Sequence, residues 1–545
     1  MSAPSYAHGT FDTPLLGDTI GAHFERTAAR FADRDALVSC HQGVRLTYAE
    51  LDAAIDALAG GLLRAGVEAG DRVALWAPNC IEWVLVQYAT AKVGAILVNV
   101  NPAYRSHELE YVLRQSGARL LFSVSAFKSS DYAAMIEEVA GGVETLERTV
   151  FVDGDDWAEL AAGEPDREAI ATRMAALSFD DPINIQYTSG TTGFPKGATL
   201  SHHNILNNGF FVTELLHLAE DDVTCLPVPF YHCFGMVMGN LGTLAHGACV
   251  VIPAPSFDAG ATLGAVAAER VTSLYGVPTM FIAMLEHDDF DAFDLGSLRT
   301  GIMAGSPCPI EVMKKVVDRM HMSEVAICYG MTETSPVSTQ TRVDDPLERR
   351  VGSVGRVGPH VEVKVIDPES GLVVERGEPG ELCTRGYSVM LGYWQDPERT
   401  GEALDGAGWM HTGDLATMDD DGYLNIVGRS KDMVIRGGEN IYPREIEEFL
   451  YAVEGVADVQ VVGVPDERYG EELCAFVAAR PGADLDEDAV RDFCRDRLAH
   501  FKVPRYVLFT DEFPMTVTGK VQKFKLREAA IERLGLESAA AVRSA

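Results

Sequence analysis

The sequence predicts an α/β protein with a large N-terminal domain of helix-covered, mostly parallel sheets and a small β subdomain, followed by a mobile α+β C-terminal lid domain. Three observations support this fold class. Strand-like and helix-like segments alternate through the first third of the chain and again from 181 to 304. Short β-like runs with frequent glycine follow from 352 to 427, and a separate α+β pattern begins after residue 428. We place the large domain at 1–428, a hinge at 429–432 and the lid domain at 433–545.

The first third shows the alternation most clearly. The run Thr47-Tyr48-Ala49-Glu50 is typical of a capping box, apolar residues follow at helical spacing over 51–63, and Gly66 is a suitable C-terminal stop. A strand over 71–76, a helix over 81–93 and a strand over 95–100 come next. Repeated strand–helix–strand units of this kind indicate a parallel sheet. The acidic, alanine-rich segment 153–175 is interpreted as a surface connection.

The last third changes character twice. Short β-like runs occupy 361–366, 380–385 and 423–427, and they predict the small β subdomain. After the connector 428–431, Pro443 suits the first position of a helix that continues through Tyr451. Two strands at 459–464 and 473–479 and a helix over 486–499 complete a compact α+β domain.

Composition excludes several classes of protein. The chain has 545 residues, 47% hydrophobic and 23% charged, with 45 basic against 81 acidic residues and a net charge of −36. This balance argues against nucleic acid as a partner, because phosphate-rich surfaces need clustered Lys and Arg. No apolar stretch is long enough for an integral membrane segment, and the N-terminus has neither a secretory signal nor an Arg-rich transit peptide. We therefore expect a cytoplasmic protein, with its oligomeric state open and a homo-oligomer compatible with the sequence.

The ten cysteines agree with a reducing compartment. None lies within four residues of another, so the sequence contains no CxxC pair. Zinc-ribbon and thioredoxin-like sites are excluded on this spacing. We expect most of these thiols to be small, buried apolar groups.

The most informative segment is a loop between 187 and 197. It follows an alternating strand (Ile183, Ile185, Tyr187) and precedes a helix that Ser201 can cap. Glycines allow close backbone approach to an anion, hydroxyls donate hydrogen bonds, and a lysine supplies positive charge, a combination that suits a polyphosphate. The spacing differs from the common P-loop, because Pro195 stands five residues after Gly190, and a polar glycine-rich turn is the alternative. The candidate ligands are Thr188, Ser189, Gly190, Thr191, Thr192, Gly193 and Lys196.

This loop resembles the signature of the adenylate-forming superfamily of acyl-CoA synthetases, luciferases and peptide-synthetase adenylation domains. Other motifs follow in that family's order: 329–334 (YGMTET), 413–414 (GD), 428–432 (GRSKD), 437–441 (GGENI) and 514–520 (PMTVTGK). The segments 429–445 and 500–528 are most similar to the medium-chain fatty acyl-CoA synthetase branch. The resemblance implies two half-reactions: a carboxylate attacks the α-phosphorus of ATP to give acyl-adenylate and pyrophosphate, and coenzyme A then displaces AMP.

Joining two anions requires positive charge and a metal. By the resemblance, Lys520 bridges the acyl carboxylate and the α-phosphate; a solvated lysine on a turn is the alternative. Its surroundings favour the first interpretation, because 495–527 holds eight basic against three acidic residues in an otherwise acidic chain. Glu333 is the implied Mg²⁺ ligand, and Thr332 lies beside it near the α-phosphate.

The resemblance also implies the nucleotide contacts. Tyr329 offers a ring for the adenine to stack on, with Gly305-Ser306-Pro307 as the opposite wall and Gly330 and Met331 beside it. Cys328 contributes its backbone carbonyl and is rejected as a nucleophile. Asp414 accepts hydrogen bonds from the ribose hydroxyls, and Arg429 donates on the ribose side.

The acyl and coenzyme A contacts complete the expected site. His232 stands at the mouth of the acyl pocket, with a packed core histidine as the alternative. No Lys or Arg occurs in the two wall segments 275–281 and 303–305, so a second charge on the acid is not expected. We expect rotation about the hinge residue Lys431 to exchange the two faces of the lid, with an ordinary loop and a solvated lysine as the alternative. We expect Gly437, Gly438 and Glu439 to form the coenzyme A tunnel. The remaining pocket residues are Met236, Tyr275, Gly276, Met280, Met303, Ala304 and Gly305.

The sequence therefore predicts an ATP-dependent, AMP-forming fatty acyl-CoA synthetase that acts on a medium-chain acid with ATP, Mg²⁺ and coenzyme A. Three alternatives remain open. The first is the same chemistry on an aryl or long-chain acid, because chain length depends on pocket depth. The second is a stand-alone adenylation enzyme that loads a carrier protein, and the third is a binding protein without catalysis.

Overall fold

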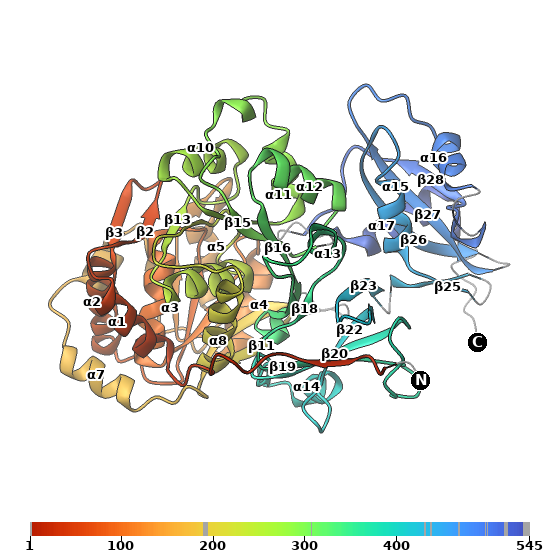
Figure 1. The fold of residues 1–545 in the computed structure, drawn as a ribbon. Helices are drawn as coiled ribbons and strands as arrows, with labels where there is room; N and C mark the ends of the chain where they lie inside the picture. The colour runs from red at the N-terminus through yellow and green to blue at the C-terminus, as the bar shows by residue number, and fades with distance from the viewer. Residues whose placement is uncertain are drawn as a thin grey trace. The chain divides into compact units, whose positions relative to one another are not determined.

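The chain folds into two compact units in the computed structural model (Figure 1). The structure describes residues 3–188, 195–306, 308–429, 432–436, 439–466, 469–495, 498, 500–516 and 521–537, and for residues 429, 439 and 440 it describes the backbone only. One unit comprises 7–363 and 384–411, and the other comprises 1–6, 364–383 and 412–545. The domain boundaries at 428 and 433 expected from the sequence remain a prediction.

The first sheet of the larger unit has seven strands, in the order β21-β11-β10-β5-β4-β6-β9. The five strands from β10 to β9 are parallel, and β11 runs antiparallel to β10. The bounds are Gly392–Tyr393 (β21), Lys196–Ser201 (β11), Pro182–Thr188 (β10), Ile96–Asn99 (β5), Arg72–Trp76 (β4), Leu120–Ser123 (β6) and Arg148–Phe151 (β9).

Helices cover both faces of this sheet, as alternation along its strands requires. In β4, Val73 and Leu75 pack into the cluster that contains α1 to α3, whereas Ala74 and Trp76 pack with α4 and α5. Trp76 stacks on Tyr132 of α5 with ring centroids 3.7 Å apart. The helices are Ile20–Arg30 (α1), Tyr48–Arg64 (α2), Ile81–Val93 (α3), Ser106–Ser116 (α4), Tyr132–Ala140 (α5), Asp155–Ala161 (α6) and Arg167–Ala175 (α7).

The second sheet of this unit has nine strands, in the order β18-β17-β16-β15-β14-β12-β13-β2-β3. Its six central strands, β16 to β2, are parallel. The bounds are Arg356–Val357 (β18), Val337–Gln340 (β17), Glu324–Gly330 (β16), Thr300–Ala304 (β15), Ser273–Gly276 (β14), Val223–Cys225 (β12), Cys249–Ile252 (β13), Asp35–Ser39 (β2) and Val44–Thr47 (β3).

Helical segments connect the later strands of the larger unit. One of them, η1 (Phe234–Leu241), is a π-helix, a rare form that is frequent at functional sites. The others are His202–Glu214 (α8), Gly242–Ala245 (α9), Ala259–Glu269 (α10), Pro278–Leu285 (α11), Phe290–Ala292 (η2), Ile310–Arg319 (α12), Thr332–Thr334 (η3), Leu347–Gly352 (α13) and Pro397–Ala403 (α14); a small hairpin joins Ala126–Phe127 (β7) to Ser130–Asp131 (β8).

Two further sheets complete the fold. The order β1-β19-β20-β22-β23 comprises Tyr6–His8, Val361–Ile366, Gly380–Gly386, Met410–Met418 and Leu424–Arg429. In the second, β25 (Glu439–Ile441), β24 (Val434–Arg436), β27 (Gly470–Ala479) and β26 (Val456–Asp466) lie in that order, and β28 (Tyr506–Phe509) pairs with β27. The helices near this sheet are Pro443–Leu450 (α15), Glu487–Cys494 (α16), His500–Lys502 (η5) and Lys523–Leu534 (α17).

Most of the local predictions are confirmed, and one needs correction. Thr47 and Glu50 form the expected capping box, and Pro443 is the first residue of α15. The segment 153–175, interpreted as a surface connection, is mostly exposed, and it holds two helices that were not predicted, α6 and α7. The helix expected over 486–499 ends at Cys494.

The fold class predicted from the sequence is confirmed: both sheets of the larger unit are mostly parallel and helix-covered, and the C-terminal part is α+β. Nine of the ten cysteines are buried, and Cys40 is exposed. Within the described part of the chain, no helix has the length and apolar character needed to span a membrane.

Candidate active site

A β-hairpin holds both ends of the predicted phosphate loop. Strand β10 ends at Thr188, β11 begins at Lys196, and these two residues are directly paired in the antiparallel register. The loop residues between them, 189–194, lie outside the described residues, as does Pro307. Ser201 ends β11 and caps α8, since its hydroxyl accepts a hydrogen bond from the Asn204 N–H at 3.1 Å. The hairpin therefore fixes the two described phosphate-loop residues, Thr188 and Lys196, opposite each other.

Glu333 lies buried beside the ends of this hairpin. It belongs to the short helix η3, and its side chain is 4% exposed. Its Oε1 atom accepts a hydrogen bond from the Tyr393 hydroxyl at 2.8 Å, and the Thr188 hydroxyl lies at 3.5 Å. Lys196 Nζ donates to the same Tyr393 hydroxyl at 3.2 Å. The structure thus brings together three predicted residues: Tyr393 links Lys196 to Glu333, and Thr188 contacts Glu333 directly.

Tyr393 is a site residue that the sequence analysis missed. Burial raises the pKa of its phenol, and the neighbouring Glu333 carboxylate raises it further, so the hydroxyl stays protonated and can donate to Glu333. No periodicity or spacing marks this residue, because its partners lie 197 and 60 residues away in the chain. A glycine followed by two aromatic residues, Gly392-Tyr393-Trp394, is the only local signal.

The predicted adenine walls lie at the carboxyl ends of adjacent parallel strands. Strand β15 ends at Ala304, which pairs with Cys328 of β16. Gly305 and Ser306 follow the first of these strands, and Tyr329 and Gly330 end the second. Ligands of open α/β sheets bind at this edge. Close packing requires glycine at 330, because a Cβ atom there would stand 1.8 Å from the Pro336 carbonyl oxygen.

Two neighbours of these walls are also placed by the structure. Thr332 is buried, and its hydroxyl oxygen lies 3.7 Å from Cys233 Sγ. Met331 precedes η3, where its N–H donates to the Thr334 hydroxyl at 3.1 Å. Burial raises the pKa of the Cys328 thiol, which keeps the sulfur protonated.

The predicted acyl-pocket residues belong to, or lie next to, the π-helix η1, the helix α11 and the ends of β14 and β15. His232 Nδ1 accepts a hydrogen bond from the Phe234 N–H at 3.1 Å, which orients the ring at the start of η1. The Tyr275 and Phe234 rings stack with centroids 5.9 Å apart. Tyr275 and Met303 are fully buried, Met236 and Ala304 are buried, and Met280 is partly buried. Gly276 pairs with Met303 at the ends of β14 and β15.

In the smaller unit, Asp414 and Arg429 occupy opposite positions on two paired strands. They are directly paired in the register of β22 and β23, and Asp414 is 9% exposed. The N–H of Asp414 donates to the Thr412 hydroxyl at 3.1 Å, and the preceding Gly413 donates to Glu381 Oε1 at 3.1 Å. Gly413 has φ +69°, a conformation that favours glycine.

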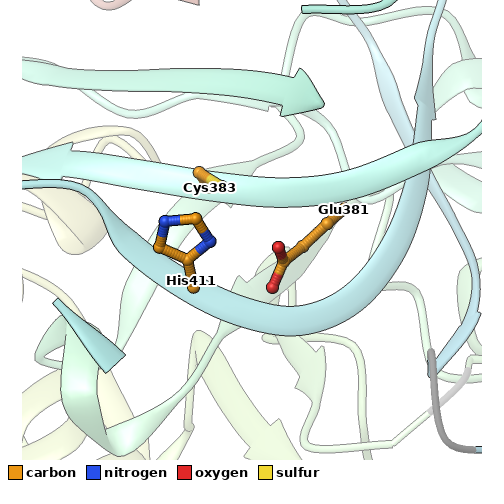
Figure 2. A group of neighbouring side chains, drawn as sticks. All are labelled: Glu381, Cys383 and His411. Carbon is orange, nitrogen blue, oxygen red and sulfur yellow. The ribbon is translucent and has the colours of Figure 1, made fainter. Parts of the chain in front are cut away.

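Figure 2 shows Glu381 with Cys383 on β20 and His411 on β22. Glu381 is engaged with the backbone of Gly413, and this contact fixes the turn that leads into Asp414. We therefore interpret the Glu381 carboxylate as support for the predicted ribose ligand.

Several predicted site residues lie outside the described part of the chain or are described by their backbone only. Lys520, the hinge residue Lys431 and the two tunnel glycines, Gly437 and Gly438, lie outside the described residues. Glu439 begins β25, and only its backbone is described. The roles assigned to these residues stay predictions.

Two mostly parallel sheets with glycines at the ends of their strands are typical of nucleotide-binding enzymes, and comparison with known proteins identifies the family. The family model of the AMP-binding enzyme matches residues 24–394, and that of the AMP-binding enzyme C-terminal domain matches residues 445–520. The chain belongs to the AMP-binding enzyme family, so the family resemblance seen in the sequence motifs is confirmed.

Similar proteins cover nearly the whole chain. YngI of Bacillus subtilis (strain 168) is 49% identical over 546 residues, covering 96% of this chain and 99% of the relative. The mitochondrial medium-chain acyl-CoA ligase ACSF2 of Macaca fascicularis is 44% identical over 559 residues, covering 98% and 90%. Among solved structures, ATP-bound MatB from Rhodopseudomonas palustris is similar with a TM-score of 0.84 and 32% identity, covering 94% of this chain and 99% of that chain.

Proposed function

We propose that this chain is an ATP-dependent, AMP-forming acyl-CoA ligase that prefers a medium-chain fatty acid. One observation carries the proposal. The buried Glu333 carboxylate and the Lys196 ammonium meet at Tyr393, beside the paired ends of the phosphate loop. The Tyr393 hydroxyl lies 2.8 Å from Glu333 Oε1 and 3.2 Å from Lys196 Nζ, so one hydroxyl holds both a carboxylate ligand for a cation and a positive charge for a polyphosphate. Membership of the AMP-binding enzyme family and the likeness to ACSF2 support the reaction class.

The reaction proceeds in two balanced steps. A carboxylate oxygen of the acid attacks the α-phosphorus of ATP, and the bond from that phosphorus to the oxygen bridging to the β-phosphate breaks, which releases pyrophosphate. The sulfur of coenzyme A then attacks the acyl carbonyl carbon, the carbon–oxygen bond to AMP breaks, and the thiol proton leaves to solvent. In the first step negative charge gathers on the phosphates, and preorganised positive groups stabilise it. We assign that role to Lys196 and Lys520.

Glu333 and Thr188 are the residues that would hold Mg²⁺. A carboxylate oxygen and a hydroxyl oxygen are hard ligands of the kind Mg²⁺ takes, and Mg²⁺ needs few of them because phosphates and water complete its shell. The two side chains lie 3.5 Å apart, with Glu333 buried. When bound, the ion neutralises phosphate charge. The donor set therefore fits this metal.

The nucleotide and coenzyme A assignments extend the sequence prediction. We assign the adenine to the wall formed by Tyr329 and Gly305, and the ribose hydroxyls to Asp414 and Arg429. We assign the pantetheine arm of coenzyme A to Gly437 and its neighbours, reached by rotation at Lys431. The coarser statement, that ATP and coenzyme A are substrates, follows the family and the relatives named as acyl-CoA ligases.

The apolar character of the wall segments favours an alkyl acid. No Lys or Arg occurs in 275–281 or 303–305, Tyr275, Met236 and Met303 are buried, and the Tyr275 ring stacks on Phe234 of η1. Burial of each methylene contributes about 0.8 kcal/mol, or roughly a fourfold gain in affinity. We therefore expect kcat/KM to rise with each added carbon until the pocket is filled, with a maximum at about six to twelve carbons.

A screen across acids tests the function. The purified chain is incubated with ATP, Mg²⁺ and straight-chain acids of increasing length, and pyrophosphate release is measured with and without coenzyme A; benzoate and acetate serve as comparison acids. We expect release with medium-chain acids and thioester formation with free coenzyme A. A preference for acetate, for a substituted benzoate or for long-chain acids would overturn the proposed substrate. Adenylation without transfer to free coenzyme A would favour a carrier-protein loading enzyme instead.

The cellular location and the oligomeric state of the chain need separate experiments. We propose a cytoplasmic location, supported by the bacterial relative YngI, although the ACSF2 relatives are named as mitochondrial. Fractionation of the source cells decides between these compartments. Light scattering of the purified chain measures the oligomeric state, for which a homo-oligomer remains the open proposal.

A further inference from the structure

We propose that Tyr393 is a positioning residue for the adenylation step: its hydroxyl holds Lys196 and Glu333 apart and oriented for MgATP. This role for Tyr393 rests on the proposed function, because the proposed function assigns Glu333 to the metal and Lys196 to the phosphates. It adds a residue from a different part of the chain, 392–394, that none of the predicted motifs contains.

The backbone around Tyr393 is fixed from both sides. Strand β21 pairs with β11, with Tyr393 opposite Ala198. The N–H groups of Leu391 and Trp394 donate to the carbonyls of Thr199 and Gly197 at 2.9 and 2.7 Å. The N–H of Tyr393 itself donates to the Thr400 hydroxyl at 2.9 Å, where α14 begins its second turn. The side chain therefore projects from a short strand anchored to the strand that begins with Lys196.

The side chain contacts both charged groups at once. Its hydroxyl donates its single proton to Glu333 Oε1 at 2.8 Å and accepts from Lys196 Nζ at 3.2 Å. The ammonium also lies 4.4 Å from the centre of the ring, within cation–π distance. Tyr393 is 6% exposed, so water does not replace these contacts.

This placement prevents the two charges from pairing with each other. The ion pairs found within the described part of the chain do not include one between Lys196 and Glu333, although both approach the same hydroxyl. A direct pair would neutralise the carboxylate needed for the cation and the ammonium needed for the phosphates. The Tyr393 hydroxyl donates to Glu333 Oε1, the oxygen that Thr188 also contacts, and this hydrogen bond fixes the orientation of the carboxylate. Groups that orient a metal ligand in this way change metal affinity when they are removed.

The test is the variant Tyr393→Phe, which removes only the hydroxyl and keeps the ring and its contact with Lys196. Mn²⁺ replaces Mg²⁺ as the probe, and its binding to the full chain with a non-hydrolysable ATP analogue is measured by electron paramagnetic resonance. We expect the dissociation constant for Mn²⁺ to rise roughly 10–100-fold, as for other lost partners of metal ligands. The Mg²⁺ concentration that gives half-maximal pyrophosphate release should rise in parallel.

Tyr48→Phe is the matched control. The Tyr48 hydroxyl is also buried and donates to a backbone carbonyl, that of Ala248, at 2.7 Å. Its loss is the same chemical change at a position in α2 that contacts neither Lys196 nor Glu333. We expect unchanged Mn²⁺ affinity, and thermal melting of both variants shows whether each is folded. If both variants lose Mn²⁺ affinity equally, the effect of Tyr393 is structural and the inference is wrong.

Glu333→Gln separates this inference from the proposed function. If Glu333→Gln weakens Mn²⁺ binding and Tyr393→Phe does not, Glu333 binds the metal without help from Tyr393, and only the inference fails. If neither variant weakens Mn²⁺ binding, the metal role assigned to Glu333 fails first. Loss of affinity in both, with Tyr48→Phe unaffected, supports both assignments.

Discussion

Lys92 offers the sharpest test of the packing of the larger unit. Its side chain is fully buried in α3, yet its ammonium contacts three carboxylates, Glu25 of α1 at 2.9 Å and Asp52 and Asp56 of α2 at 2.8 and 2.6 Å. Burial by itself lowers the pKa of this ammonium, but the three carboxylates outweigh burial and the pKa is raised. One cation therefore links three helices on one face of the seven-stranded sheet.

The perturbation is Lys92→Met, which keeps the length of the apolar stem and removes the charge. Removing one partner of a buried ion pair costs about 3–5 kcal/mol, because the other charge is left uncompensated. Here only Asp56 is strongly buried, at 6% exposed, whereas Glu25 and Asp52 are 43% and 25% exposed and regain water. Asp56 also keeps a distant partner, Arg167, at 3.7 Å. We therefore expect the lower end of that range, about 3 kcal/mol in the free energy of unfolding.

Urea unfolding followed by tryptophan fluorescence is a suitable assay. The five tryptophans (Trp76, Trp83, Trp157, Trp394 and Trp409) all lie in the larger unit, so the signal reports on that unit alone. Lys314→Met is the control: its pair with Glu311 is 49% and 64% exposed, and we expect a loss below about 1 kcal/mol. Adding Asp56→Asn to Lys92→Met should recover part of the loss, because it removes the uncompensated buried charge.

The pH dependence follows from the direction of the shift. A raised pKa in the folded state means that the contribution of Lys92 is present below its unfolded pKa, near 10.5, and is lost as pH rises through the higher folded value. The difference between wild type and Lys92→Met should thus stay constant from about pH 6 to 9. A loss no larger than that of Lys314→Met would refute the charge-linked packing of these helices.

Three further predictions concern the reaction. Lys520→Ala should slow adenylation roughly 10²–10³-fold while largely sparing thioester formation from supplied acyl-adenylate; equal loss of both half-reactions in rapid-quench assays would contradict the assignment. Lys431→Pro fixes φ near −65°, so adenylate should still form while transfer to coenzyme A collapses, and an unchanged transfer rate would rule out rotation at this residue. Gly330→Ala should weaken ATP binding in calorimetry, because its Cβ would stand 1.8 Å from a carbonyl oxygen, whereas Gly352→Ala, with no atom within 4 Å, should not.

Local patterns in the sequence predicted local structure well. The sequence pattern that marks a helix start at Thr47, Ser201 and Pro443 is confined to three or four residues in each case. A helix begins at each of these positions, as expected. The helices α6 and α7 escaped prediction because each buries a single apolar residue, Leu160 and Ile170, too few to produce a helical period.

Site residues whose role depends on contacts between distant segments could not be predicted from the sequence. Glu333 and Thr188 could be named because each stands in a recognisable motif. Tyr393 could not, because its role arises only when β21 pairs with β11 and brings the ring to Lys196 and Glu333. Neighbouring residues in the sequence give no indication of that pairing, since a strand of two residues has no period to detect.

The products of a complete turnover test the central claim most directly. The purified chain is supplied with ATP, Mg²⁺, coenzyme A and a medium-chain acid such as octanoate, and all nucleotide and thioester products are quantified by chromatography. We predict AMP, pyrophosphate and octanoyl-CoA in equal amounts, with no AMP formed when the acid is omitted. Formation of ADP and phosphate, or AMP without a matching amount of thioester, would contradict an AMP-forming acyl-CoA ligase.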